Sequence, residues 1–145
     1  MRRNRTLPKI LKLKDNRKKE LEIEVKKAAD RVDEEESRLR ELEKRYTDTL
    51  RIFDEKQSGG GMDAKDITSY YNFFSRINVM IDEQRRIHSR CRDELRMLKD
   101  TLVTAHRDKK MFEILNDRAV RGETREREVS ERKETDFFTL TRKLR

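Results

Sequence analysis

Apolar residues recur at a heptad spacing on both sides of three consecutive glycines, Gly59 to Gly61. In each half they form two rows that alternate by three and four residues, like the a and d positions of a coiled coil. Before the glycines, the rows comprise Leu11, Lys18, Val25, Val32, Leu39, Tyr46 and Phe53, and Leu7, Lys14, Leu21, Ala28, Glu35, Leu42 and Thr49. After the glycines, they comprise Ile67, Phe74, Ile81, His88, Leu95 and Leu102, and Tyr70, Ile77, Gln84, Cys91, Leu98, Ala105 and Phe112. The shared period predicts two long helices that fold back on each other.

Composition excludes a globular core, and the heptad register then decides between a coiled coil and a disordered chain. Charged residues make up 47% of the chain and hydrophobic residues 32%. So few apolar residues cannot fill a round core, but a two-helix seam needs only about two in seven. Such a composition is also typical of disordered chains. A disordered chain has no reason to keep a heptad register, so we reject disorder for residues 7–112.

The glycines mark the reversal between the two helices. Each glycine costs a helix about 1 kcal/mol relative to alanine, and glycine readily adopts the positive φ that a reversal needs. Asp63 is the expected N-cap of the second helix, and Thr6 to Pro8 is a plausible start of the first. The predicted fold is all-α, a long two-stranded antiparallel coiled-coil hairpin with an overhanging C-terminal helix. Its expected parts are a first helix with a basic N-terminal arm (1–57), a Gly-rich turn (58–62), a second helix (63–115) and an unpaired extension (116–145).

A turn centred on Gly60 also predicts the register of the hairpin. It places Tyr46 opposite Phe74 and Phe53 opposite Ile67. The polar interruptions of the seam, Glu35, Gln84 and His88, then fall together. Because buried polar groups need partners, we expect these three side chains to form one polar layer, which can also specify the alignment of the helices.

A second apolar stripe lies beside the seam near the turn. Ile52, Phe73, Met80 and Ile87 occupy g positions and Tyr71 an e position, where charged residues are usual. The stripe predicts a docking surface for a partner protein. The alternative is a widened seam that hides part of it.

The formal net charge is +8, with 38 basic and 30 acidic side chains mixed along most of the chain. Most of this charge is expected to be solvated surface. The N-terminal arm is more clearly basic, and either contacts an acidic surface or frays in solvent. Nucleic acid is a further alternative, disfavoured because few aromatic residues interleave with the basic ones. The arm contains Arg2, Arg3, Arg5, Lys9, Lys12, Lys14, Arg17, Lys18 and Lys19.

No catalytic, cofactor or metal site is predicted. The two histidines, His88 and His106, lack the spacing of a metal pair, and Cys91 is the single cysteine. The glycine run lacks the Lys-Ser/Thr of a phosphate loop, and we find no pairing of nucleophile and base. The single cysteine and the absence of a signal peptide predict a cytosolic protein, and no apolar run is long enough to span a bilayer.

Three segments carry a family resemblance. They are LPKILKLKDNRKKELE at residues 7–22, Tyr70-x-x-Phe73-x-x-x-Ile77-x-x-x-Ile81-x-x-Gln84 after the turn, and Lys133-x-x-Asp136-x-Phe138 near the end. In their order and spacing they resemble the FliJ family, the stalk-like general chaperone of the bacterial flagellar type III export apparatus. The third segment departs from the family pattern, since Phe137 stands where the family has glutamate.

The resemblance implies a function that the periodicity alone does not show. Members form an antiparallel coiled coil like the rotary stalk of ATP synthase, with the helix ends inside the hexameric export ATPase and the tip at the membrane export gate. They couple ATP hydrolysis to export, and they bind and recycle export chaperones. This implies a cytoplasmic protein, peripherally associated with the inner membrane and monomeric outside the complex, with no cofactor and no nucleic acid. The rivals are the equivalent stalk of a virulence-type injectisome and a purely structural dimer.

The resemblance also implies two sets of contact residues. For the export gate they are Tyr46, Leu50, Phe73, Ile77, Met80 and Gln84. For the ATPase ring they are Arg2, Arg3, Arg5, Lys9, Lys12, Lys133, Asp136, Phe137 and Phe138.

Overall fold

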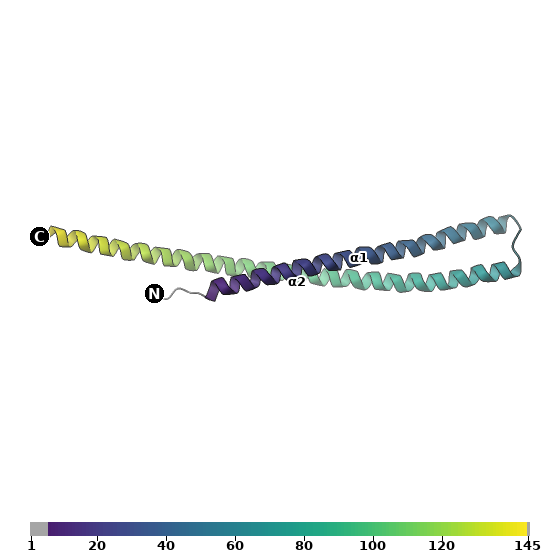
Figure 1. Ribbon diagram of the computed structural model, residues 1–145, viewed down its shortest axis with the longest axis horizontal. Helices are drawn as coiled ribbons and strands as arrows, with labels where there is room; N and C mark the ends of the chain where they lie inside the picture. Colours follow the sequence, from purple (N-terminus) through teal and green to yellow (C-terminus); the bar gives the residue numbers. More distant parts are fainter. Residues whose placement is uncertain (1–5, 145) are drawn as a thin grey trace. The chain divides into compact units, whose positions relative to one another are not determined.

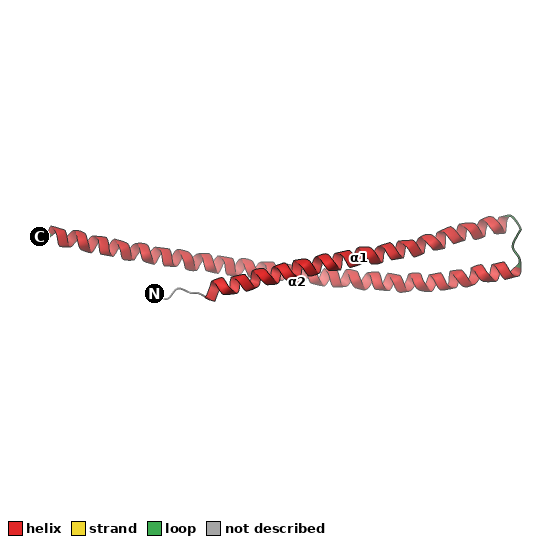
Figure 2. Cartoon of the chain, viewed as in Figure 1, coloured by secondary structure: helices red, strands yellow, loops and turns green. Residues whose placement is uncertain are grey.

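The computed structural model describes residues 6–144 as two α-helices joined by a short turn (Figure 1). Helix α1 is Thr6–Ser58 and helix α2 is Ala64–Lys143. No strand occurs among the described residues (Figure 2). The predicted all-α coiled-coil hairpin is confirmed.

The chain divides into two compact units, which are considered separately. One consists of residues 22–100 and contains the turn; we call it the turn unit. The other combines residues 1–21 with residues 101–145, of which 6–21 and 101–144 are described; we call it the end unit. In each unit a stretch of α1 packs beside a stretch of α2.

Burial follows the two heptad rows. The buried hydrophobic side chains all belong to them: Leu21, Ala28, Ile77, Ile81, Cys91 and Ala105. Glu35 is the buried polar member of the rows. The remaining members are half-buried except Ile67, which is exposed, and the intervening positions are mostly exposed. The helices are therefore held together along a narrow apolar seam, because removing these side chains from water supplies most of the stabilisation available to such a fold.

Aromatic rings fill the seam of the turn unit near the turn. The ring of Phe74 lies edge-to-face against Tyr46, with centroids 5.4 Å apart, as the register predicts. Phe53 packs against Tyr70 at 5.4 Å and against Phe74 at 6.0 Å. Edge-to-face pairs of this kind add about 0.5–1.5 kcal/mol each beyond their buried area.

The expected pairing of Phe53 with Ile67 is not seen. Ile67 is 46% exposed, and Phe53 contacts the rings of Tyr70 and Phe74 instead. The rings of Tyr70 and Phe74, one and two turns after Ile67, take the place beside Phe53 that the register assigned to Ile67. On α2 the coiled-coil seam thus begins at Tyr70, which is the next seam position after Ile67, where the sequence pattern places its start.

Helix α1 ends in a Schellman motif built on the glycines. Gly60 has a φ of 68°. Its N–H donates to the carbonyl of Gln57 at 3.2 Å, and the N–H of Gly61 donates to the carbonyl of Lys56 at 3.4 Å. These are the two bonds that define the motif, and they satisfy carbonyls that the end of a helix leaves free.

Helix α2 begins with the predicted cap. Asp63 Oδ1 accepts a hydrogen bond from the Asp66 N–H at 2.9 Å. This satisfies one of the free N–H groups of the first turn and places negative charge at the positive end of the helix dipole. The Schellman motif and the cap together fix both sides of the reversal.

Replacing Gly60 with alanine is expected to destabilise the protein by about 1–2 kcal/mol, because an L-residue is strained at positive φ. Gly61→Ala is the matched control. Gly61 has no positive φ and no atom within 4 Å of an added Cβ, so this change should be neutral or slightly stabilising. Urea unfolding followed by circular dichroism measures both, and equal effects would contradict the assignment of the turn to Gly60.

Candidate partner-binding surfaces

One polar group is buried in the seam of the turn unit. Glu35 is 8% exposed, and its carboxylate accepts a hydrogen bond from Gln84 Nε2, which also donates to the Glu35 carbonyl at 3.0 Å. Arg38 Nη1 lies 2.8 Å from Glu35 Oε1. The buried carboxylate is therefore satisfied by one partner from each helix, as a buried charge requires.

The predicted polar layer is thus formed by Glu35 and Gln84, with a different third member. In the described part of the chain no hydrogen bond joins His88 to either residue, and Arg38 takes that place. The Glu35–Arg38 contact could have been predicted from the sequence, since the two residues are at i and i+3 spacing and so lie on the same face of α1. The heptad pattern missed it because Arg38 is outside the seam positions.

The apolar stripe beside the seam is accessible in the turn unit. Met80 is 48% exposed, Ile52 and Ile87 are each 41% exposed, and Tyr71 is exposed as well. Phe73 is half-buried, with its ring 5.7 Å from that of Phe74. The seam therefore does not widen enough to cover the stripe, which remains open to a partner.

The residues predicted for the export gate differ in accessibility. Met80 and Leu50 are exposed and can be reached directly. Ile77 is only 3% exposed, and Gln84 is committed to Glu35. Tyr46 is half-buried against Phe74. Of the six predicted residues, Met80 and Leu50 are therefore directly accessible, Phe73 is partly so, and Tyr46, Ile77 and Gln84 are engaged within the seam.

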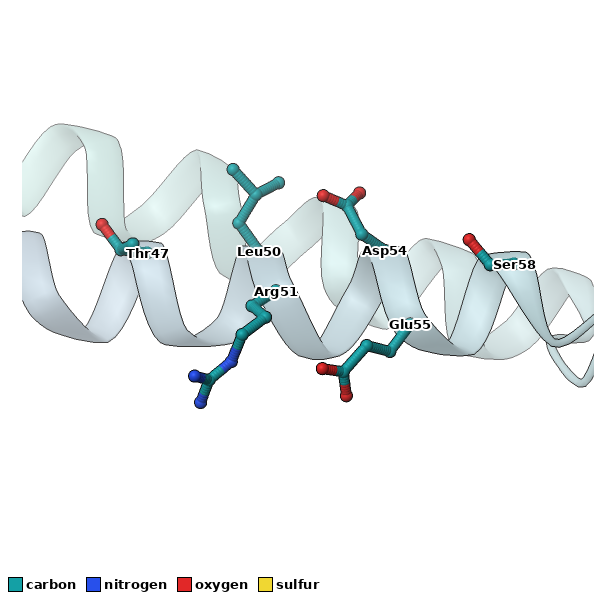
Figure 3. Close-up of a pocket in the computed structure, with 6 residues that line it drawn as sticks. All are labelled: Thr47, Leu50, Arg51, Asp54, Glu55 and Ser58. Carbon is teal, nitrogen blue, oxygen red and sulfur yellow. The ribbon is translucent and has the colours of Figure 1, made fainter.

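Leu50 lines a shallow hollow on the outer side of α1 near the turn (Figure 3). Leu50 projects from one side of the helix with Thr47, Asp54 and Ser58, while Arg51 and Glu55 project from the other. Nearby, Lys56 Nζ donates to the Tyr70 hydroxyl at 3.0 Å, and this bond raises the pKa of Lys56. The hollow is open and offers an apolar contact bordered by charge.

In the end unit, charged side chains hold α1 against α2. Lys109 Nζ lies 2.7 Å from Asp15 Oδ1 and 3.6 Å from Glu113 Oε1. Lys14 Nζ lies 3.6 Å from Asp108 Oδ2 and 5.5 Å from the centroid of the Phe112 ring. Lys109 and Lys14 both stand at seam positions, so ion pairs and a cation–π contact replace apolar packing here.

The residues predicted for the ATPase ring all lie in the end unit. On α1, Lys9 and Lys12 are exposed. On α2, Lys133, Asp136, Phe137 and Phe138 are exposed, and the two phenylalanine rings lie 6.2 Å apart. Arg2, Arg3 and Arg5 fall outside the described residues.

The end of α2 also contains a pattern that the sequence reasoning overlooked. Counting the heptads of α2 onward places Phe137, Leu140 and Leu144 at consecutive seam positions. Their side chains are 67%, 61% and 87% exposed. The apolar seam phase thus resumes after a polar stretch, and in the end unit no other helix covers it.

Neither helix of the described residues is both long and apolar enough to cross a membrane. Within the same residues, no group of three or more potential metal ligands comes together.

These features define a helical coiled-coil protein with exposed apolar side chains beside and beyond its seam. The family model described as "Flagellar FliJ protein" matches residues 3–144. The chain therefore belongs to the FliJ family, whose members are structural or chaperone-type components of the flagellar export apparatus. Neither the search of curated proteins nor the search of solved structures found a match.

Replacing Gln84 with alanine is expected to cost about 1–3 kcal/mol of stability, because the buried Glu35 carboxylate loses its partner from α2. Gln57→Ala, at an exposed position of α1, is the control and should change stability by less than about 0.5 kcal/mol. Thermal unfolding measures both. In the Glu35→Leu background the loss from Gln84→Ala should shrink, and an unchanged loss would show that the two residues do not interact.

The end unit should lose stability in acid through Asp15. Hydrogen bonds from Lys109 and then Lys19 lower the pKa of Asp15, and the bond to Asp15 raises the pKa of Lys109. The contribution of Asp15 is therefore complete above the ordinary carboxyl range and is lost as pH falls through the lowered pKa. The contribution of Lys109 is lost only as pH rises through its raised pKa.

Asp15→Asn should remove the acid-dependent part of this loss. Hydrogen exchange of residues 6–21, measured across the acid range, tests it. Asp33→Asn, on the exposed surface of the turn unit, is the control. If the pH dependence of the two variants is the same, the Asp15–Lys109 pair does not contribute.

Proposed function

We propose that this protein is a stalk-like component and chaperone escort of the bacterial flagellar type III export apparatus. It binds the hexameric export ATPase and the membrane export gate, and couples ATP hydrolysis to export. The observation that carries the proposal is the presence of two exposed apolar groups on a framework whose own seam is already closed. One is the stripe of the turn unit, and the other is the end of α2.

The stripe of the turn unit supports the gate contact. Met80 and Ile87 are exposed beside a closed seam, and Phe73 is held in place by Phe74. A contiguous apolar surface with a rigid base is what a protein interface uses for its central contacts. Tyr46, Ile77 and Gln84 would then act by positioning this surface, while Met80, Phe73 and Leu50 touch the gate.

The end unit supports the ATPase contact. The exposed Phe137 and Phe138, with Lys133 one turn before and Asp136 immediately before them, can enter an apolar collar rimmed by charge. Most helical stability in proteins comes from packing of an apolar face, so binding inside a ring would stabilise the exposed end of α2. Lys9 and Lys12 of α1 add positive charge in the same unit.

The role as chaperone escort and the position at the cytoplasmic face of the inner membrane rest on family membership. Export chaperones would bind a surface that these two contacts leave free. Peripheral association with the membrane would follow from binding the gate.

Binding of full-length variants to the purified ATPase hexamer and to the cytoplasmic domain of the gate tests both contacts. Phe73→Ala with Met80→Ala should weaken gate binding at least about tenfold and leave ATPase binding unchanged. Phe137→Ala with Phe138→Ala should do the reverse. Isothermal titration calorimetry or surface plasmon resonance measures each affinity.

Val79→Ala with Met97→Ala is the matched control, because both residues are exposed apolar positions of α2 outside the two surfaces. It should alter neither affinity by more than about twofold. Loss of both contacts in either test variant would indicate a folding defect, which circular dichroism would reveal. If the wild type binds neither partner, the proposed function is wrong.

A further inference from the structure

The face of α2 turned away from the seam carries a regular row of exposed residues in the end unit. The spacing within the row alternates between four and three, so that all its members lie along one side of the helix. We call this set the outer row; it comprises Arg107, Met111, Ile114, Arg118, Arg121 and Arg125, all exposed. The seam positions of the same stretch, Ala105, Phe112 and Ala119, are buried or half-buried on the opposite side.

Among the described residues, no acidic side chain pairs with the arginines of the outer row. No ion pair joins any of the four in the described part of the chain, although elsewhere arginines pair readily along a helix, as Arg40 does with Glu36 at 2.8 Å. Asp108 and Glu113, which flank the start of the row, are engaged by Lys14 and Lys109. Within residues 6–144 the row therefore presents guanidinium groups that form no ion pair.

The row also contains an apolar centre. Met111 is 51% exposed and Ile114 is 53% exposed, and Leu115 lies beside them at 40%. Gly122 stands between Arg118 and Arg125, and no atom lies within 4 Å of the position that a Cβ would occupy there. A glycine in the interior of a helix costs about 1 kcal/mol, yet it permits another backbone to approach closely.

This arrangement matches one kind of partner best. Guanidinium groups bind carboxylates through paired hydrogen bonds. The exposed side chains of Met111 and Ile114 would pack against apolar side chains of a partner. From Arg107 to Arg125 the row extends about 27 Å at 1.5 Å per residue, the length of an ordinary helix. A helix bearing an apolar stripe beside acidic residues would meet both requirements at the same period.

Two other anionic partners fit less well. The row has no aromatic side chain on which a nucleic-acid base could stack. Its apolar centre is small compared with the apolar face of a helix that lies in a membrane surface. An acidic protein helix is therefore favoured over both.

We propose that the outer row is a docking site for an acidic amphipathic helix of another protein. The site is separate from Lys133, Asp136, Phe137 and Phe138, and from the stripe of the turn unit. It does not depend on the export role, because it follows from the charge and spacing of α2 alone.

The test uses the full-length protein and a synthetic, fluorescently labelled amphipathic helix with glutamates on both sides of a leucine stripe. Wild type should bind it with an affinity that falls as salt rises. Arg118→Glu with Arg121→Glu should weaken binding at least about tenfold, and Met111→Ala with Ile114→Ala severalfold. Fluorescence anisotropy measures each affinity.

Arg86→Glu with Arg90→Glu is the matched control, since it makes the same charge change at exposed positions of α2 in the turn unit. The affinity of this control variant for the synthetic helix should remain within about twofold of the wild-type value. Equal losses in both double variants would show that net charge alone governs binding and would overturn the site. Tighter binding to anionic phosphatidylglycerol vesicles or to single-stranded DNA, lost in the outer-row variant, would replace the acidic helix with that ligand.

Discussion

The apolar seam is the constraint on which everything else in this protein depends. Two helices that pair without any larger core bury only about two residues in seven between them. Nearly every other position is therefore exposed. Stabilisation is therefore spread thinly along the seam, and each departure from apolar packing must be satisfied locally. Glu35 is satisfied by Gln84 and Arg38, and Lys14 and Lys109 by Asp108 and Asp15.

The same constraint explains why the remaining apolar side chains are informative. The side chains of Met80, Ile87, Phe137 and Phe138 are not packed in the seam and are exposed beside it or beyond it. In a globular protein such residues would be unremarkable, because much of any protein surface is apolar. In a chain where 47% of the residues are charged, they stand out, and they are the basis of the partner contacts that we propose.

The sequence predicted the parts of the fold that depend on period and on local chemistry. Tyr46 meets Phe74 and Glu35 meets Gln84 because the glycine turn sets the register, and Asp63 caps α2 because capping needs only a nearby oxygen. It failed where the size or reach of a side chain decided the outcome. The rings of Tyr70 and Phe74 displaced Ile67, and Arg38 reached Glu35 from outside the seam. The surfaces could be found from position and burial, but the identity of their partners depends on family membership.

The clustering of aromatic rings next to the turn has a consequence for how the chain folds. The entropy lost on closing a loop grows with its length, so Phe53 and Tyr70 can meet at far smaller entropic cost than Lys14 and Phe112. The contacts nearest Gly60 also include the edge-to-face ring pairs of Phe53 with Tyr70 and Phe74, which add to the energy of apolar burial. Folding is therefore expected to nucleate at the turn and to proceed outward along the seam, with contacts such as that of Lys14 with Phe112 forming late.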